Sequence, residues 1–270
     1  MKNFFGKYWL FLKMAFFYNA SYKFHVVMEL VGLFSQLILF YFISKLVSPE
    51  KIPGLAAYQN DYFAFVLVGI AFSGYFAVVM GGPAGGLRED MSLGTLESFV
   101  LSPEPLLFIT IWYTAWGLFK ATVNTFIYLL AGLLMFNLTL PSFPVFSALF
   151  LLFISLLAFL PLGILGAAFV LVFKQGNPIN LLYTLFKFIG GVYFPITLFP
   201  DWLQKLAWFQ PFTPALEGLR KVVLGGASLS QVTFEIKLLT GFTLVLFPVS
   251  VWCFQLAYRR ARLAGSLSHY

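Results

Sequence analysis

Charged side chains are scarce in this sequence. Asp, Glu, Lys and Arg make up 10% of the 270 residues and hydrophobic residues make up 60%, whereas an ordinary soluble domain carries about 25% charged residues. A mean hydropathy of +0.89 agrees with this composition. The composition therefore excludes an ordinary soluble domain and indicates a polytopic membrane protein, and the length suits one membrane domain with short loops.

Cysteine and histidine are also rare. Cys253 is the single cysteine, so an intramolecular disulfide is excluded and the redox compartment stays open. The two histidines, His25 and His269, stand far apart, and the sequence has no metal-spaced cluster, nucleophile elbow or Asp-rich diphosphate motif. A membrane-embedded lipid-modifying enzyme would lack its catalytic residues here. We expect no metal, no cofactor and no catalytic residue in this chain.

Basic residues outnumber acidic ones, and the formal net charge is +7. In a membrane protein, excess Lys and Arg mark the cytoplasmic loops and meet anionic lipid. Nucleic-acid binding would need a basic, solvated face, and the sequence has none. Membrane lipid is therefore an expected partner and nucleic acid is not.

Long apolar runs predict six membrane-spanning segments. A helix needs about 20 apolar residues to cross a bilayer, and such runs cover residues 26–46, 62–80, 106–136, 146–173 and 238–258. A further run over 179–192 is too short to cross comfortably and leads into an apolar segment broken by several prolines. Irregular backbone at membrane depth is tolerated where protein buries it, so we expect a re-entrant hairpin over 193–231.

Two other segments carry expectations of their own. Residues 1–24 mix aromatic residues with four lysines, which predicts a helix lying in the membrane interface; a first spanning segment is the alternative. The run Gly81-Gly82-Pro83-Ala84-Gly85-Gly86 is expected to end the second spanning helix, because Gly and Pro are poor residues for a helix interior.

The distribution of basic residues predicts the orientation. With both termini in the cytoplasm, the cytoplasmic loops hold more Lys and Arg than the opposite side, and Arg259, Arg260 and Arg262 directly follow the last span. This orientation places the connector over 84–105 in the cytoplasm and the proline-rich segment outside.

The connector between the second and third spans has the pattern of a short helix. Thr95 can cap a helix over 96–101, and Pro103 ends it. Leu96, Phe99 and Val100 fall on one face at i, i+3 and i+4 spacing. A helix this short is unstable alone, so this face must dock against its own membrane domain or against a partner protein.

The connector, with its Gly94-Thr95-Leu96-Glu97 and Ser102-Pro103, resembles the first cytoplasmic loop of the ABC-2 type permeases, the membrane subunits of type-2 ATP-binding-cassette exporters. The segment before the last span resembles that family too, in Tyr193-Phe194-Pro195-Ile196, Phe199-Pro200-Asp201-Trp202-Leu203, Pro211-Phe212-Thr213-Pro214 and Glu217-Gly218-Leu219-Arg220. The resemblance covers nearly the whole chain.

The resemblance implies an all-α integral membrane fold over 25–270, with six transmembrane helices, an interfacial helix over 1–24, a coupling helix within 84–105 and re-entrant helices before the last span. It implies a homodimer on two copies of a separate ATPase subunit in the cytoplasmic membrane. This chain has no Gly-x-x-x-x-Gly-Lys-Ser/Thr loop, so ATP and Mg would bind the partner. The residues implied to contact that ATPase are Arg88, Glu89, Gly94, Thr95, Leu96, Glu97, Phe99, Val100, Ser102 and Pro103.

Charged residues inside spans are candidates for a transport pathway. Lys120 lies mid-span among Thr and Asn residues, and Lys187 could pair with Asp201 or Glu217 or lie in the pathway. Glu29, near Lys23 and His25, is expected to form a salt bridge or to snorkel. The full set of pathway and gate candidates is Lys120, Lys187, Tyr193, Phe194, Pro195, Phe199, Pro200, Glu217 and Arg220.

The function that these patterns favour is export of a hydrophobic or amphipathic substrate, a drug, an antibiotic or a lipid-linked molecule. Export of a polysaccharide, a glycolipid or ions is an alternative within the same family. A self-sufficient secondary transporter would show inverted repeats with polar residues at matched midplane positions, and the sequence shows no convincing repeat.

Overall fold

The computed structural model describes residues 13, 23–48, 52, 54–58, 60–102, 105–136, 144–174 and 178–263, and its regular elements there are helices. Five helices are long and apolar enough to cross a membrane. They are α2 (Lys23–Leu46), α3 (Tyr62–Leu93), α5 (Leu106–Met135), α6 (Val145–Phe173) and α10 (Thr233–Leu263).

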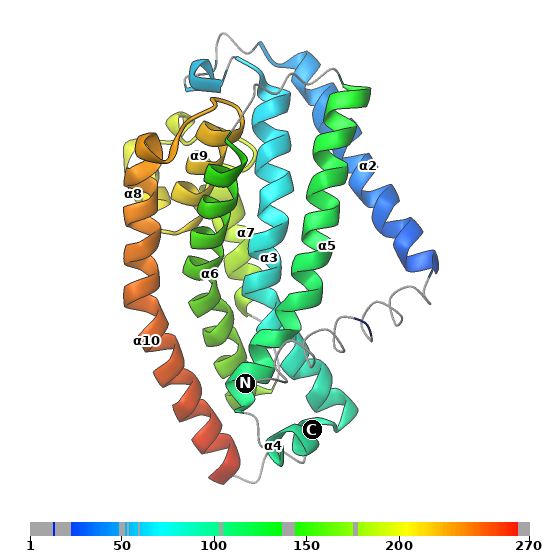
Figure 1. The fold of residues 1–270 in the computed structure, drawn as a ribbon, viewed down its shortest axis with the longest axis vertical. Helices are drawn as coiled ribbons and strands as arrows, with labels where there is room; N and C mark the ends of the chain where they lie inside the picture. Colours follow the sequence, from blue (N-terminus) through cyan, green and yellow to red (C-terminus); the bar gives the residue numbers. More distant parts are fainter. Residues whose placement is uncertain are drawn as a thin grey trace.

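Shorter elements lie at the two ends of this bundle (Figure 1). Helix α4 (Leu96–Val100) sits at one end, together with the end of α10. The opposite end holds η2 (Leu55–Tyr58), α8 (Asp201–Trp208) and α9 (Phe212–Val223). The remaining elements are α7 (Pro178–Ile189), η3 (Ile196–Leu198) and η4 (Leu229–Val232).

Helix α3 is the centre of the bundle. It packs against α5 on one side and α6 on the other, and α6 in turn packs against α10. Phe76 of α3, Phe159 of α6 and Phe212 of α9 form one aromatic cluster, with ring centroids 4.3 to 5.4 Å apart. Aromatic pairs at this spacing are favourable contacts, and this cluster fixes α9 to the two central helices.

The glycine-rich run does not end the second spanning helix, contrary to the expectation. Helix α3 continues through Pro83 to Leu93. A Cβ at Gly86 would overlap the ring of Tyr113, and a Cβ at Gly163 of α6 would overlap the carbonyl of Val79. The glycines therefore let neighbouring helices approach closely, as small residues do in membrane helices, and membrane helices tolerate an internal proline.

The other predicted boundaries agree more closely with the structure. The third and fourth spans correspond to α5 and α6, while α10 begins before residue 238 and extends beyond residue 258. The short fifth run forms α7, a helix of 12 residues, too short for a regular crossing. The predicted interfacial helix over 1–24 falls outside the described residues, apart from positions 13, 23 and 24.

Candidate functional site

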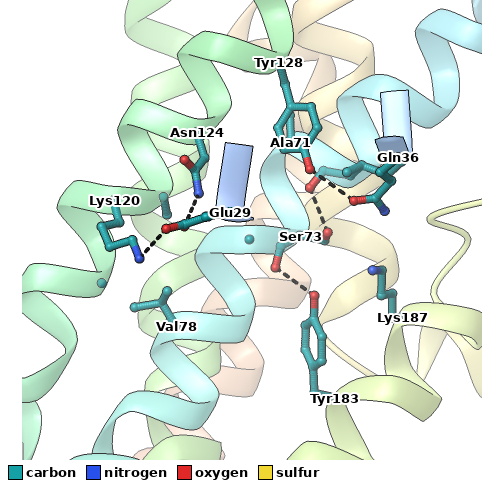
Figure 2. A pocket seen from close by; sticks show the side chains of 14 residues that line it. Glu29, Gln36, Ala71, Ser73, Val78, Lys120, Asn124, Tyr128, Tyr183 and Lys187 are labelled. Atoms are coloured by element: carbon teal, nitrogen blue, oxygen red, sulfur yellow. Dashed lines mark hydrogen bonds and ion pairs between the residues drawn. The ribbon is translucent and has the colours of Figure 1, made fainter. Parts of the chain in front are cut away.

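A cavity of about 360 Å³ with both polar and apolar lining residues lies in the apolar bundle, between α2, α3, α5 and α7. Figure 2 shows side chains from these helices around it. Its lining residues are Glu29, Gln36, Ile70, Ala71, Ser73, Gly74, Val78, Gly117, Lys120, Ala121, Asn124, Tyr128, Tyr183 and Lys187. Charged and amide side chains among apolar helices are costly unless they find partners, so this cavity is the candidate functional site.

The α5 side of the cavity holds an ion pair. Nζ of Lys120 lies 2.7 Å from Oε2 of Glu29 on α2, and each side chain is about a third exposed, at 31% and 29%. Nδ2 of Asn124 donates to Oε1 of the same carboxylate at 3.2 Å. Lys120 is thus neutralised by Glu29 and Asn124 fixes the carboxylate. The carboxylate reaches a lysine on another helix, a partner that the sequence did not reveal.

Lys187 of α7 faces the same cavity from the other side (Figure 2). Its amine lies 5.1 Å from the centre of the Tyr193 ring, a cation–π contact. The Tyr193 ring stacks on Phe40 of α2 at 5.2 Å. No ion pair among the described residues includes Lys187, so neither of the partners considered for it, Asp201 or Glu217, neutralises it.

Tyrosine hydroxyl groups tie the walls of the cavity together. Tyr183 of α7 donates to the carbonyl of Ser73 on α3 at 3.2 Å, and Tyr128 of α5 donates to Oε1 of Gln36 on α2 at 3.1 Å. Each bond joins two helices, so the cavity is a connected part of the fold. Sequence reasoning missed these four residues, although polar side chains in apolar runs are the signal that could have found them.

Gly74 leaves the centre of the α3 wall open. A Cβ built at this position meets no atom within 4 Å. Figure 2 shows α3 passing between the Lys120–Glu29 side and the Lys187–Tyr183 side. Because Gly74 lines the cavity, a bulky side chain at position 74 would project into its open space.

The described residues that were predicted to contact an ATPase subunit lie at the end of the bundle that holds α4 (Figure 1). Helix α3 ends at Gly94, whose φ of 70° is the left-handed conformation common at helix ends. The hydroxyl of Thr95 donates to Oδ1 of Asp90 at 3.0 Å, and the Tyr113 hydroxyl of α5 donates to the other oxygen of the same carboxylate. Buried Asp90 thus joins α3, α5 and the start of α4, a role that sequence reasoning missed.

The apolar face of α4 turns toward the chain's own membrane helices. Leu96 is 1% exposed, and Phe99 packs against the same core cluster, which includes Leu87, Leu106 and Phe254. The helix begins as predicted and ends at Val100, one residue before the predicted end. The sequence left open whether this face docks against the chain's own membrane domain or against a partner protein. The structure shows it docked against the chain's own membrane domain.

The outward side of α4, which faces away from the chain's own membrane helices, is accessible. Ser98 is exposed, and so is Leu101 directly after the helix, at 81%. Neither of these two was among the predicted contact residues. Of the residues that were, Glu89, Gly94 and Thr95 are exposed and Arg88 and Ser102 are half-buried. The side chains of Glu97 and Val100, and the whole of Pro103, lie outside the described residues.

Arg220 is a buried structural centre at the opposite end of the bundle. Its side chain is fully buried, donates to the carbonyls of Phe65 at 3.1 Å and Val192 at 3.0 Å, and lies 3.7 Å from Oε1 of Glu217. The Tyr58 hydroxyl donates to the same carboxylate. The predicted Glu217–Arg220 pair is therefore present, and it fastens α9 to α3 and to the segment after α7.

Burial shifts the pKa values of two side chains in this cluster. Removal from water lowers the pKa of Arg220 to about 10, although the charge of Glu217 opposes the shift. Burial also raises the pKa of Tyr58, and the charge of Glu217 raises it further. At neutral pH the guanidinium stays charged and the phenol stays a donor, so the network holds together.

The remaining gate candidates lie beside this cluster. Pro195 is buried, Phe199 is half-buried, and Phe194 and Pro200 are exposed. The structure thus brings Lys120 and Lys187 to one cavity, with Tyr193 beside Lys187, and leaves the other gate candidates outside its lining. Within the part of the chain that the structure describes, no group of three His, Cys, Asp or Glu residues is placed to hold a metal ion.

Comparison with known proteins identifies a family over most of the sequence. A family model described as ABC-2 type transporter matches residues 8–224. A search of curated proteins found no match. The matched range includes every residue of the cavity, the whole of α4 and the Arg220 cluster.

Proposed function

The chain belongs to the ABC-2 type transporter family, and on that premise we propose that it is the permease subunit of an ATP-driven exporter of hydrophobic or amphipathic molecules. Membership makes the chain a multi-pass membrane component of an ABC transporter that works with an ATPase subunit. ATP and Mg would bind that ATPase. The export direction and the class of cargo are our proposals.

The observation that carries the proposal is the continuous connection from α4 to the cavity. Asp90 binds Thr95 next to α4 and Tyr113 on α5. Helix α3, which carries Asp90, also carries Ser73 and Gly74 of the cavity, and α5 also carries Lys120. A push on α4 would therefore move two of the four cavity walls.

This connection suits alternating access. Closure of two ATPase subunits on binding ATP would press on the outward side of α4 in each of two permease copies. Because packed helices move as rigid bodies rather than deforming continuously, α3 and α5 would shift together. The cavity would then change its access from one side of the membrane to the other, with ATP favouring one of two states.

The proposed orientation places α4 in the cytoplasm. Exposed Arg259, Arg260 and Arg262 lie on the last turns of α10, at the same end of the bundle as α4 (Figure 1). Basic residues next to a span favour the cytoplasmic side. In this arrangement both termini are cytoplasmic, and the short run that contains α7 is the fifth of six spans. Residues 193–231 form re-entrant or external structure that includes Glu217 and Arg220.

The mixed lining of the cavity favours an amphipathic cargo. Ile70, Ala71, Val78 and Ala121 offer apolar surface, and the polar groups described above stand beside them. Binding sites for organic ligands commonly combine apolar walls with a few placed polar groups. This combination suits a molecule with an apolar body and a polar head.

The proposal is tested by co-purification with ATPase subunits from the same genome. We expect the wild-type chain to retain one of them and to stimulate its ATP hydrolysis. The changes Ser98→Arg and Leu101→Asp, on the outward side of α4, should each reduce retention and stimulation at least about tenfold, the loss expected when a contact worth about 1.4 kcal/mol is removed.

The matched control is Ser230→Arg, a change at an exposed serine in η4, between α9 and α10. It should retain the ATPase at wild-type level. If the wild-type chain retains no ATPase subunit, the proposed function is wrong. If all three variants retain it equally, α4 is not the contact.

A further inference from the structure

We propose that the cavity between α2, α3, α5 and α7 binds the acidic group of an amphipathic anion, a carboxylate or phosphate on an apolar body, with Lys187 as the principal partner of that group. The inference rests on the proposed function only in taking this cavity as part of the transport path. The binding itself needs neither ATP nor an ATPase.

The charged side chains that line the cavity do not balance one another. Its lining holds one carboxylate, Glu29, and two ammonium groups, Lys120 and Lys187. Glu29 and Lys120 neutralise each other at 2.7 Å. Lys187 has no carboxylate partner among the ion pairs of the described residues. The cavity therefore carries one positive charge that the described part of the protein does not balance.

Lys187 carries that charge at a position where an anion can reach it. An ammonium group among apolar helices is costly unless it is paired, and the Tyr193 ring at 5.1 Å offsets only part of the cost. An anion in the cavity would supply what the ring does not. Lys187 faces the cavity in Figure 2, so a bound acidic group can reach it without a change of fold.

Cationic and neutral ligands fit the cavity less well than an anion. A cationic ligand would meet the unbalanced ammonium, and the one carboxylate already accepts from Lys120 and Asn124. A neutral ligand would leave Lys187 without an anionic partner. A ligand with negative charge would supply Lys187 with the partner that the ion pairs of the described residues do not provide.

The cavity also has room for the apolar part of the ligand. Gly74 leaves open space in the α3 wall, and a volume of about 360 Å³ falls within the range of about 300–1,000 Å³ typical of ligand pockets. Two sources of such a ligand exist. One is an acidic phospholipid of the membrane, and the other is a free amphipathic acid that the transporter exports.

The test uses the full-length chain purified in a neutral detergent and a matched pair of fluorescent probes, dansyl-labelled undecanoic acid and its methyl ester. The two probes have the same apolar body and differ in the acidic group. We expect the wild-type chain to bind the acid about 10- to 100-fold more tightly than the ester, the preference that a charge-assisted hydrogen bond provides.

Four variants test which residues produce the preference for the acid over the ester. Lys187→Gln should remove it, and Lys187→Arg should retain most of it because the charge remains. Gly74→Phe should weaken binding of both probes by filling the cavity. Lys237→Gln removes an exposed lysine on α10 outside the cavity lining and should leave the preference intact. Similar melting temperatures of the variants would show that they fold.

Two results would overturn the proposal. One is equal affinity of the wild-type chain for the acid and the ester. The other is a preference for the acid that Lys187→Gln reduces no more than Lys237→Gln does. Competition then separates the sources. Displacement of the acid by phosphatidylglycerol and not by phosphatidylcholine supports a lipid occupant, and binding of the acid that phosphatidylglycerol does not displace supports an exported acid. A chain that binds the acid but retains no ATPase contradicts the proposed function alone.

Discussion

Glu29 and Lys120 show how a single residue inside the membrane acquires its role from its partner. They are 91 positions apart in sequence, yet they form an ion pair across α2 and α5. Lys187 has the same chemistry as Lys120 but a different surrounding, an aromatic ring instead of a carboxylate. The two lysines therefore have different functions in our account: Lys120 stabilises the wall of the cavity, and Lys187 is left for a ligand.

A double-mutant cycle tests the role of Lys120. Glu29→Gln and Lys120→Gln each leave one charge unpaired, so the double variant should be more stable than the sum of the single changes predicts. We expect a coupling of about 0.5–1.5 kcal/mol, the range of polar interactions between membrane helices. Thermal unfolding of the four purified proteins measures it. Strict additivity within error would show that the pair contributes nothing to stability.

Helix α3 shows that the neighbours of an element can override its local preferences. Its sequence contains Pro83 and several glycines, which are unfavourable in an isolated helix, yet the helix runs unbroken from Tyr62 to Leu93. In the membrane an unpaired backbone group is costlier than in water, so the chain keeps its helical hydrogen bonds. Gly82 and Gly86 then provide flat surface for α5, and Gly163 of α6 does the same for α3.

Neighbouring glycines provide a matched test of this packing role. A Cβ at Gly86 would overlap the Tyr113 ring, while a Cβ at Gly85 meets no atom within 4 Å. Gly86→Ala should destabilise the protein by about 1–3 kcal/mol through overpacking. Gly85→Ala should be neutral or stabilise it by up to about 1 kcal/mol through helix propensity. Melting temperatures of the two purified variants give the comparison, and equal shifts would contradict the packing role.

At the scale of the whole molecule, the two ends of the bundle differ in chemistry. One end carries α4 and the arginines that follow Tyr258, and the other carries the buried Arg220 cluster and the short helices around it (Figure 1). This asymmetry suits a protein that meets an ATPase at one membrane surface and releases cargo at the other. The cavity lies on helices that extend toward both ends.

Site-directed labelling tests the proposed orientation. In a Cys253→Ser background, Ser98→Cys in α4 and Ser230→Cys in η4 each place one thiol at an exposed position. A membrane-impermeant maleimide should label the α4 thiol in inside-out vesicles and the η4 thiol in right-side-out vesicles. The opposite pattern would invert the orientation, and labelling of both thiols in the same vesicles would place both segments on one side.

Sequence patterns predicted the elements more fully than the sites. Apolar runs predicted the positions of α5 and α6, and Thr95 and Pro103 predicted the position of α4. The Glu217–Arg220 pair was predicted from its i, i+3 spacing. Such features depend on neighbours in sequence. The roles of Asp90, Tyr113 and Tyr183 depend on contacts between different helices, which spacing along one helix does not reveal.

The sequence by itself determined that this chain is an all-helical membrane protein, since few charges and long apolar runs allow no other environment for it. Its connector motif indicated the family before the comparison did. The tertiary structure alone decided which polar residues meet in the membrane, because those residues come from four helices. It also turned the apolar face of α4 toward the chain's own core, since apolar Leu96 is stabilised by burial whichever surface supplies it.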